Sequence, residues 1–332
     1  NFIAIMNNIG SSSHLGIGAR ADYRARHEPL QAHSSRSRGE TSIAENERLF
    51  SHTPMRLFFV LIPAVTTTFL FAPAEAARLS PACAALMQKQ AALADEDVFQ
   101  TNVLLFSAAA SGCEDLVRDL LVRGIAIDAR DRLGRTALAL AAKAGRERVA
   151  ELLIDRGAAV DARAISGATP LFFASEADHS TIAKYLIARD ADVSLTGAGG
   201  LTPLMAAAFN GNAELVDLLL NRGADPNALD TSGKAAILYA ASRGFTPVVA
   251  RLIEAGVDVN RKYEHGLTAL MWAAGYADGA GIDDIKGVLA LLIAHGAALD
   301  TRDDRGKTAL DIARDLGHPE IADHLAAQSP AR

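Results

Sequence analysis

Three carboxylates in one glycine-rich stretch are the side chains whose types and spacing most invite a chemical role. The stretch GYADGAGIDD runs from Gly275 to Asp284 and carries Asp278, Asp283 and Asp284. Calcium prefers oxygen ligands, so a calcium site is the chemistry to consider, but the spacing does not match an EF-hand loop. We therefore predict no metal site, and interpret the stretch either as a solvent loop or as a loop that contacts a partner.

The rest of the sequence contains no recognisable catalytic or metal-binding motif. It has no H-E-x-x-H zinc motif, no G-x-S-x-G elbow and no P-loop. The histidines that follow residue 76 stand at scattered positions: His179, His265, His295, His318 and His324. The sequence therefore predicts neither an enzyme nor a bound cofactor.

Two cysteines, Cys83 and Cys113, leave two alternatives open. In an oxidising compartment they can form one disulfide. It would close a loop of about 30 residues and stabilise the fold by roughly 3–4 kcal/mol on the chain-entropy model. Two buried free thiols are the other alternative, because the sequence gives no distance between the two side chains.

An apolar segment predicts the cellular location. Met55–Ala76 reads MRLFFVLIPAVTTTFLFAPAEA, with Arg56 near its start and Ala74-Glu75-Ala76 at its end. A positive start, an apolar centre and an A-x-A site are the layout of a secretory signal peptide. An uncleaved anchor is the alternative, although the segment is short and Thr-rich for a membrane span of roughly 20 residues. We expect a periplasmic or secreted protein with no membrane span after cleavage.

The residues on either side of this segment differ in composition. Residues 1–54 are rich in Ser, Arg and His without apolar periodicity, and we interpret them as a disordered or spurious leader. Residues 77–332 would form the mature chain. The whole chain has a net charge of −6, and no clustered basic surface predicts binding to nucleic acid.

The mature part repeats itself with a fixed period. One apolar position recurs every 33 residues at Leu105, Leu138, Leu171, Leu204, Ile237 and Leu270, and the last copy, Leu310, follows after 40. A second series has the same phase: Gly124, Gly157, Asp190, Gly223, Gly256 and Gly296. Such a period indicates stacked copies of one supersecondary unit. The longer last step places the Gly275–Asp284 stretch as an insertion in the sixth unit.

Each unit predicts two short helices. A Thr stands where a hydroxyl can cap the first helix, at Thr136, Thr169, Thr202, Thr268 and Thr308. Paired small residues such as Ala141-Ala142 and Ala207-Ala208 follow, and they allow a neighbouring helix to approach closely. Gly112, Gly145, Gly211 and Gly244 are placed to end that helix. The second helix is amphipathic, with apolar residues facing inward.

These residues resemble the ankyrin repeat, through the patterns T-P-L-x-x-A-A-x-x-G and L-L-L-x-x-G-A-D-x-N-A. The resemblance implies an all-α solenoid of about seven helix-turn-helix repeats with projecting β-turn fingers. It covers residues 102–327, with residues 328–332 as a tail. The expected repeats are 102–130, 131–163, 164–196, 197–229, 230–262, 263–302 with the insertion 275–284, and 303–327.

Some repeats depart from the pattern. Asp178 and Asp190 replace both glycines of the third repeat, and a left-handed Asp is less favourable than Gly, so we expect local strain there. Ala235 replaces the capping Thr of the fifth repeat, and Thr101 stands where the first finger would have its Gly.

The two ends of the array should have polar faces, because a stacked array needs caps for solubility. At the first end we expect an N-terminal capping helix within residues 77–101, spanning about Leu79–Asp95 and carrying Cys83. A disulfide to Cys113 would pin this helix to the first repeat.

The resemblance also implies where a partner would bind. The variable positions of the fingers and first helices are Arg132, Leu133, Arg135, Lys143, Ile165, Glu176, Phe209, Asn210, Ser242, Arg243, Glu264 and His265, with Tyr276 in the insertion. We expect an exposed Phe209 to serve as an anchor, because aromatic and Arg residues dominate binding hot spots. Phe173, Tyr239 and Trp272 share another register and are interpreted as packing between repeats.

Together these expectations describe a non-catalytic, monomeric scaffold that binds another protein on its concave face. Two alternatives stay open. One is an accessory ligand- or metal-binding protein that uses the acidic loop 275–284, and the other is a secreted effector directed at a host cell.

Overall fold

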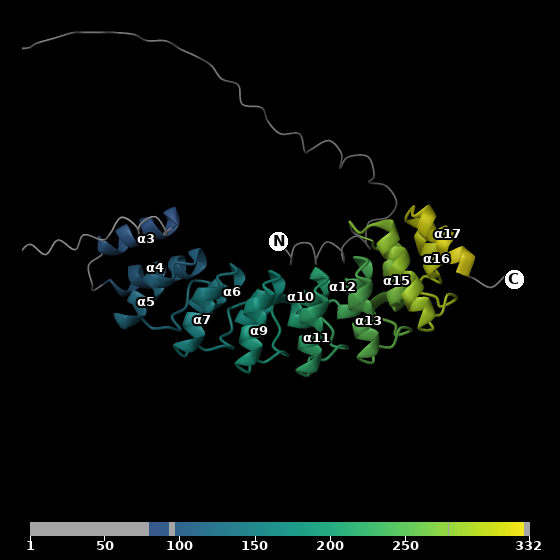
Figure 1. Ribbon diagram of the computed structural model, residues 1–332. Coiled ribbons are helices and arrows are strands. Elements are labelled where there is room, and N and C mark those ends of the chain that lie inside the picture. The colour runs from purple at the N-terminus through teal and green to yellow at the C-terminus, as the bar shows by residue number, and fades with distance from the viewer. Residues whose placement is uncertain (1–79, 93–96, 278, 329–332) are drawn as a thin grey trace, which may run out of the picture. The chain divides into compact units, whose positions relative to one another are not determined.

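A computed structural model describes residues 80–92, 97–277 and 279–328 of the chain (Figure 1). The expected leader 1–54 and signal peptide 55–76 lie outside these residues, as do Asp278 and most of the expected tail. Within the described residues every regular element is a helix, which confirms the all-α prediction. No helix among them is long and apolar enough to cross a membrane.

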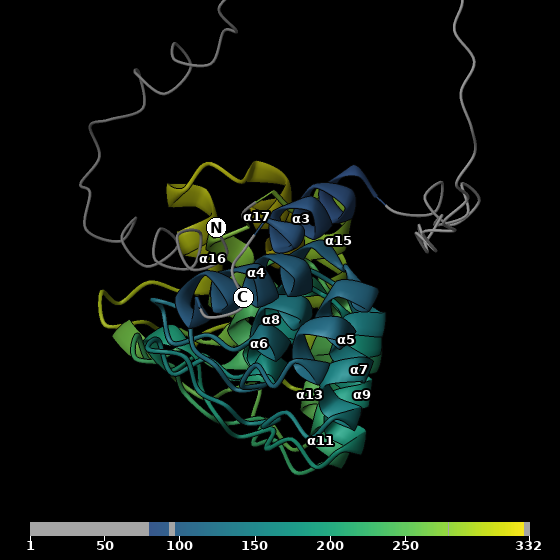
Figure 2. The same ribbon diagram turned by 90° about the vertical axis from the view of Figure 1, so that its left-hand side faces the viewer.

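The helices form seven pairs that follow one another in chain order, which confirms the ankyrin-type solenoid. The first helices are α4 (Val98–Ser111), α6 (Ala137–Lys143), α8 (Pro170–Glu176), α10 (Pro203–Asn210), α12 (Ala236–Ser242), α14 (Ala269–Gly275) and α16 (Ala309–Asp315). The second helices are α5 (Glu114–Val122), α7 (Glu147–Asp155), α9 (Ser180–Ala188), α11 (Ala213–Asn221), α13 (Thr246–Glu254), α15 (Ile282–Ala294) and α17 (Pro319–Gln328). Each first helix contacts the next first helix, and each second helix the next second helix, so the two sets form adjacent layers (Figure 2).

The first helices begin where the sequence predicts. The hydroxyls of Thr136, Thr169 and Thr202 accept hydrogen bonds from backbone N–H groups three residues later, at 3.3, 3.2 and 3.1 Å. Thr268 and Thr308 cap α14 and α16 in the same way. Ala235 precedes α12 without a side-chain cap, as expected from its methyl group. Satisfying these otherwise unpaired N–H groups stabilises each short helix.

Small residues on the first helices form the seam between repeats. The exposed fraction is 0% for the alanines of each predicted pair: Ala108, Ala109, Ala141, Ala142, Ala174, Ala207, Ala208, Ala240, Ala241, Ala273 and Ala274. Larger side chains at neighbouring positions, such as Leu138, Leu171 and Leu204, are equally buried. Close approach of consecutive first helices through methyl groups therefore creates one continuous core along the row.

The loop before each first helix from α6 to α16 turns back on itself, and we call these loops fingers and number them by the repeat that they open: residues 131–136 (second finger), 164–169 (third), 197–202 (fourth), 230–235 (fifth), 263–268 (sixth) and 303–308 (seventh). Single backbone hydrogen bonds join the second finger to the third, the fourth to the fifth and the sixth to the seventh. The Ile165 N–H donates to Leu133 O at 2.9 Å, and the Thr231 N–H to Gly199 O at 2.9 Å. Arg130 donates to the carbonyl oxygens of both Gly134 and Arg163. The fingers are thus held in a row, although no described residue lies in a strand.

The third repeat has the strained backbone that its sequence predicts. Asp178 and Asp190 have φ values of 59° and 60°, in the left-handed region that favours glycine. Asn212 of the next repeat donates a hydrogen bond to the Asp178 carboxylate at 2.6 Å. His265, in the sixth finger, shares this conformation with φ of 60°, which the sequence pattern did not indicate.

Three predicted boundaries differ from the structure. The first repeat begins earlier than residue 102, because the carboxylate of Asp97 caps α4 at Val98 and Thr101 lies inside that helix. The capping helix α3 is shorter than expected and spans Pro81–Ala91. The insertion forms less loop than expected, because α15 begins at Ile282 and has 13 residues where α13 has 9. Asp283 and Asp284 therefore belong to the first turn of a helix.

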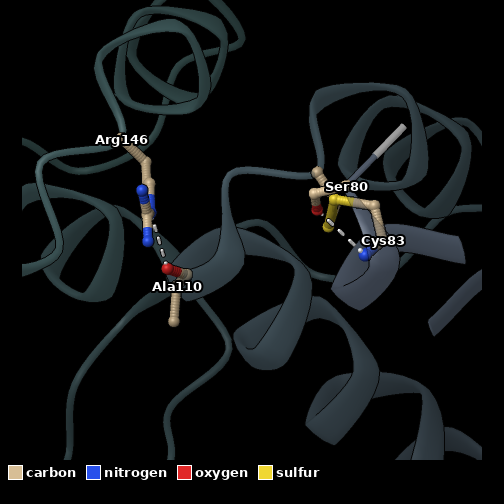
Figure 3. Close-up of a disulfide and its surroundings, with 5 residues drawn as sticks. Ser80, Cys83, Ala110 and Arg146 are labelled. Atoms are coloured by element: carbon tan, nitrogen blue, oxygen red, sulfur yellow. Dashed lines mark hydrogen bonds between the residues drawn. A yellow bond between two sulfur atoms is a disulfide. The ribbon is translucent and has the colours of Figure 1, made fainter. Parts of the chain in front are cut away.

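Cys83 and Cys113 form a disulfide with a Cα–Cα distance of 5.4 Å (Figure 3). Cys83 is the only buried residue of α3, whose apolar side chains Leu86 and Met87 are partly buried against the core. Cys113 directly precedes α5. Since α3 buries so little apolar surface, the covalent bond is the main attachment of this cap to the first repeat.

Replacing Cys83 with Ser should release α3 without unfolding the array. The disulfide's stabilisation of the folded protein, up to about 3–4 kcal/mol on the chain-entropy model, is then lost. The effect should stay local because α3 lies at the end of the array. Compared with the oxidised wild type, the variant and the reduced wild type should both exchange amide hydrogens faster in Pro81–Ala91. All three proteins should exchange slowly in α8–α12. Unchanged exchange in α3 would contradict this role of the disulfide.

Candidate functional site

The fingers carry the most exposed of the predicted binding residues. Ile165 is 78% exposed and Leu133 is 56% exposed, which is unusual for large apolar side chains. The hydrogen bond from Ile165 N–H to Leu133 O places the two residues in adjacent fingers. Arg132, Glu264 and His265 are also exposed. The finger row therefore offers apolar side chains next to charged ones on a single face.

The ends of the first helices contain the other predicted binding residues. Lys143 forms an ion pair with Glu176 of the next repeat at 3.6 Å. The Asn210 amide donates to the carbonyl oxygens of Ser175 and Glu176 at 2.9 and 3.2 Å. Lys143, Glu176 and Asn210 thus link neighbouring repeats, and of the ion pair only the Lys143 side chain is largely exposed. Arg135 is paired with Asp131 of its own finger at 2.7 Å.

Two of the predicted binding residues are not available to a partner. Phe209, expected to be an exposed anchor, is only 6% exposed, and that expectation is wrong. The guanidinium of Arg243 covers its ring at 4.4 Å, and the ring of Tyr239 meets it edge-on at 6.4 Å. Ser242 is 2% exposed, and its hydroxyl donates to the Tyr239 carbonyl oxygen at 3.2 Å. Side chains of the next repeat therefore cover Phe209, and Ser242 is buried within its own repeat's first helix.

The aromatic residues at equivalent positions of the first helices pack between repeats, as the sequence predicts. Phe173, Tyr239 and Trp272 are all buried. Lys143 lies 5.2 Å over the Phe173 ring, and Lys234 lies 5.4 Å over the Trp272 ring. A cation over an aromatic face gains electrostatic stabilisation, so both contacts support packing between repeats.

Fingers with an Asp at their first position use its carboxylate to fix their own turn, a role that sequence reasoning missed. In the second finger, the Asp131 carboxylate accepts from the N–H groups of Leu133 and Arg135 at 2.9 and 2.8 Å. Asp303 accepts from Arg305 and Lys307 in the seventh finger. Burial opposes ionisation, yet these backbone hydrogen bonds, together with those from the guanidinium groups of Arg135 and Arg305, hold the pKa of Asp131 and Asp303 below the ordinary value. The shared Asp-x-x-Gly pattern of these fingers is the signal that could have found this role.

Asp230 adds a buried polar contact between a finger and a first helix. Its carboxylate accepts from the N–H groups of Ser232 and Lys234 at 2.8 and 3.0 Å, and from the hydroxyl of Tyr239. Burial and this hydrogen bond raise the pKa of Tyr239. Burial lowers the pKa of Lys234, an effect that the nearby carboxylates of Asp230 and Glu264 oppose. Hydrogen bonds of a buried carboxylate, rather than a buried apolar side chain, therefore attach the fifth finger to its first helix.

The insertion contributes Tyr276 to the same face. Its ring is tilted against that of Trp272, with a centroid distance of 4.5 Å. The pKa of Arg305, in the seventh finger, is raised mainly by its hydrogen bond with Asp303 and to a smaller extent by Tyr276. Asp283 pairs with Lys286 at 3.9 Å. Among the residues that the structure describes, no three His, Cys, Asp or Glu side chains come together as metal ligands.

Replacing Tyr239 with Phe should lower the free energy of unfolding by about 1–3 kcal/mol, because one buried oxygen of Asp230 loses its donor. Tyr263→Phe is the matched control. Burial raises the pKa of Tyr263 to about 12, and its buried hydroxyl has no hydrogen-bond partner among the described residues. Removing that hydroxyl should leave stability unchanged or slightly higher. Equal urea midpoints for the two variants would contradict the assigned Asp230–Tyr239 contact.

Comparisons with known proteins agree with this geometry. The family model described as "Ankyrin repeats (3 copies)" matches residues 104–197 and 204–285, together more than half of the chain. The fold is similar to a crystal structure of the human ASB11 ankyrin repeat domain, at 24% identity and a TM-score of 0.60. That similarity covers 69% of this chain and 98% of the human domain. No curated protein matches the sequence. The chain belongs to the ankyrin repeat family.

Proposed function

We propose that this protein is a non-catalytic scaffold that binds another protein on its concave face, formed by the fingers and the first helices. Ankyrin repeats generally bind proteins. The observation that carries the proposal is the pair of exposed apolar side chains, Leu133 and Ile165, on adjacent fingers. Exposed apolar side chains that adjoin one another are typical of surfaces that a partner covers.

The opposite layer of second helices supports this choice of face. On α7, Glu147 and Arg148 are exposed while Val149, Ala150 and Leu153 are buried against the core. Several of its charges are paired across repeats, such as Arg189 with Asp155 at 2.7 Å and Arg251 with Asp217 at 3.1 Å. A solvated layer with paired charges offers little to a partner compared with the finger row.

We further propose that the protein acts in the periplasm or outside the cell. The signal-peptide layout of Met55–Ala76 supports export, although that segment lies outside the described residues. The disulfide between Cys83 and Cys113 supports an oxidising compartment, because such bonds are rare in reducing cytosol. The two observations are independent of each other and point to the same location.

Photo-cross-linking in the producing cell tests the proposed face and location together. A photoreactive amino acid replaces Ile165 on a finger, and Arg148 on α7 is the matched exposed control. We expect Ile165 to yield a discrete cross-linked protein in the periplasmic or culture fraction, and Arg148 to yield none. Equal yields at both positions would contradict the binding face, and a product found only in the cytoplasm would contradict export.

A further inference from the structure

Arg243 is a cation held between aromatic rings at the end of α12. Its guanidinium lies 4.4 Å from the centre of the Phe209 ring and 5.5 Å from that of Phe245. Phe209 belongs to α10 in the preceding repeat, and Phe245 directly precedes α13 in its own repeat (Figure 1). Two repeats therefore fix this one side chain, so that little conformational entropy remains to be lost when a partner binds it.

No described residue supplies a carboxylate or another acceptor to Arg243. Its Nε atom is buried and has no hydrogen-bond partner among the described residues. Two other cations that lie over aromatic rings do have acidic partners: Lys143 pairs with Glu176 at 3.6 Å, and Arg189 pairs with Asp155 at 2.7 Å. A partly desolvated guanidinium without an acceptor is unfavourable, so an acceptor brought by a partner would gain more here than at a solvated Arg.

Side chains in the same register of the neighbouring repeats surround this position with polar groups. Asn210 precedes Arg243 by 33 residues and Tyr276 follows it by 33, and both are half-buried at the ends of their first helices. Asp284 lies beside Gly244, yet no ion pair joins it to Arg243. The register thus presents an amide, a guanidinium without an acceptor in the described part of the chain, and a phenol in successive repeats.

We propose that Arg243 is the central anchor of the binding face and takes a carboxylate from an acidic segment of the partner protein. This inference rests on the proposed function and specifies the chemistry of the partner. The planar guanidinium can donate two parallel hydrogen bonds to one carboxylate, which a Lys cannot do. Arg residues packed on aromatic rings are also typical of binding hot spots.

Peptide selection tests this chemistry with a defined probe. Random linear peptides displayed on phage are selected against the protein purified as its producing cell makes it. We expect the selected peptides to share an Asp or Glu, and a synthetic peptide to bind at least roughly tenfold more weakly when that residue becomes Asn or Gln. This substitution is made in the peptide, so its result does not depend on how a protein variant folds.

Protein variants assign the contact to Arg243. Arg243→Gln should weaken binding at least roughly tenfold, and Arg243→Lys should recover only part of that loss. Arg189→Gln is the matched control, because it also removes a cation from an aromatic ring but lies on the layer of second helices. It should leave the affinity unchanged. The acidic substitution in the peptide should have no further effect on binding to Arg243→Gln.

Several results would overturn the proposal. They are a selection without binders, binders that lack an acidic residue, and equal affinity for the wild type and Arg243→Gln. If Ile165 still cross-links a partner in the cell in any of these cases, the proposed function stands and only the acidic chemistry is wrong. If cross-linking at Ile165 also fails, the proposed function and the acidic chemistry of the partner are both wrong.

Discussion

The contact between consecutive first helices is the constraint on which the rest of the structure depends. A single pair of short helices cannot bury its apolar face alone, so each repeat covers the next. Methyl groups at this seam, as in Ala207 and Ala240, let the backbones approach while larger residues such as Leu204 and Ile237 fill the space between layers. This demand for small residues at fixed positions explains why the alanine pairs recur with the period of the repeat.

Because the seam and the finger contacts hold the stack together, side chains on the finger face are free to differ from repeat to repeat. The second and third fingers present Leu133 and Ile165, whereas the fifth finger is occupied by the contact between Asp230 and Tyr239. Arg243 combines both roles, since it covers Phe209 and still has no acceptor among the described residues. A binding surface can therefore form without any change to the core.

Much of the fold was predictable from the sequence because it depends on local chemistry. Threonine N-caps and glycine C-caps act within a few residues of the helix that they bound. Thr136 therefore indicates directly where α6 begins, and Gly112 where α4 ends. The exposure of Phe209 depends on Arg243 and Tyr239 from the next repeat, which local patterns do not describe. The start of α4 was misplaced because Thr101 was assigned by its repeat phase, although Asp97 is a good capping residue. The insertion could not be divided between loop and helix from its length alone.

Urea unfolding of two alanine variants tests the seam most directly. Ala207 is 0% exposed in α10 between its neighbouring first helices, whereas Ala290 is exposed in α15. Enlarging Ala207 to Leu should lower the free energy of unfolding by about 1–3 kcal/mol, because the helices cannot separate without loss of packing. Ala290→Leu should change it by less than about 0.5 kcal/mol. Equal, small changes in both variants would show that close helix approach does not hold the repeats together.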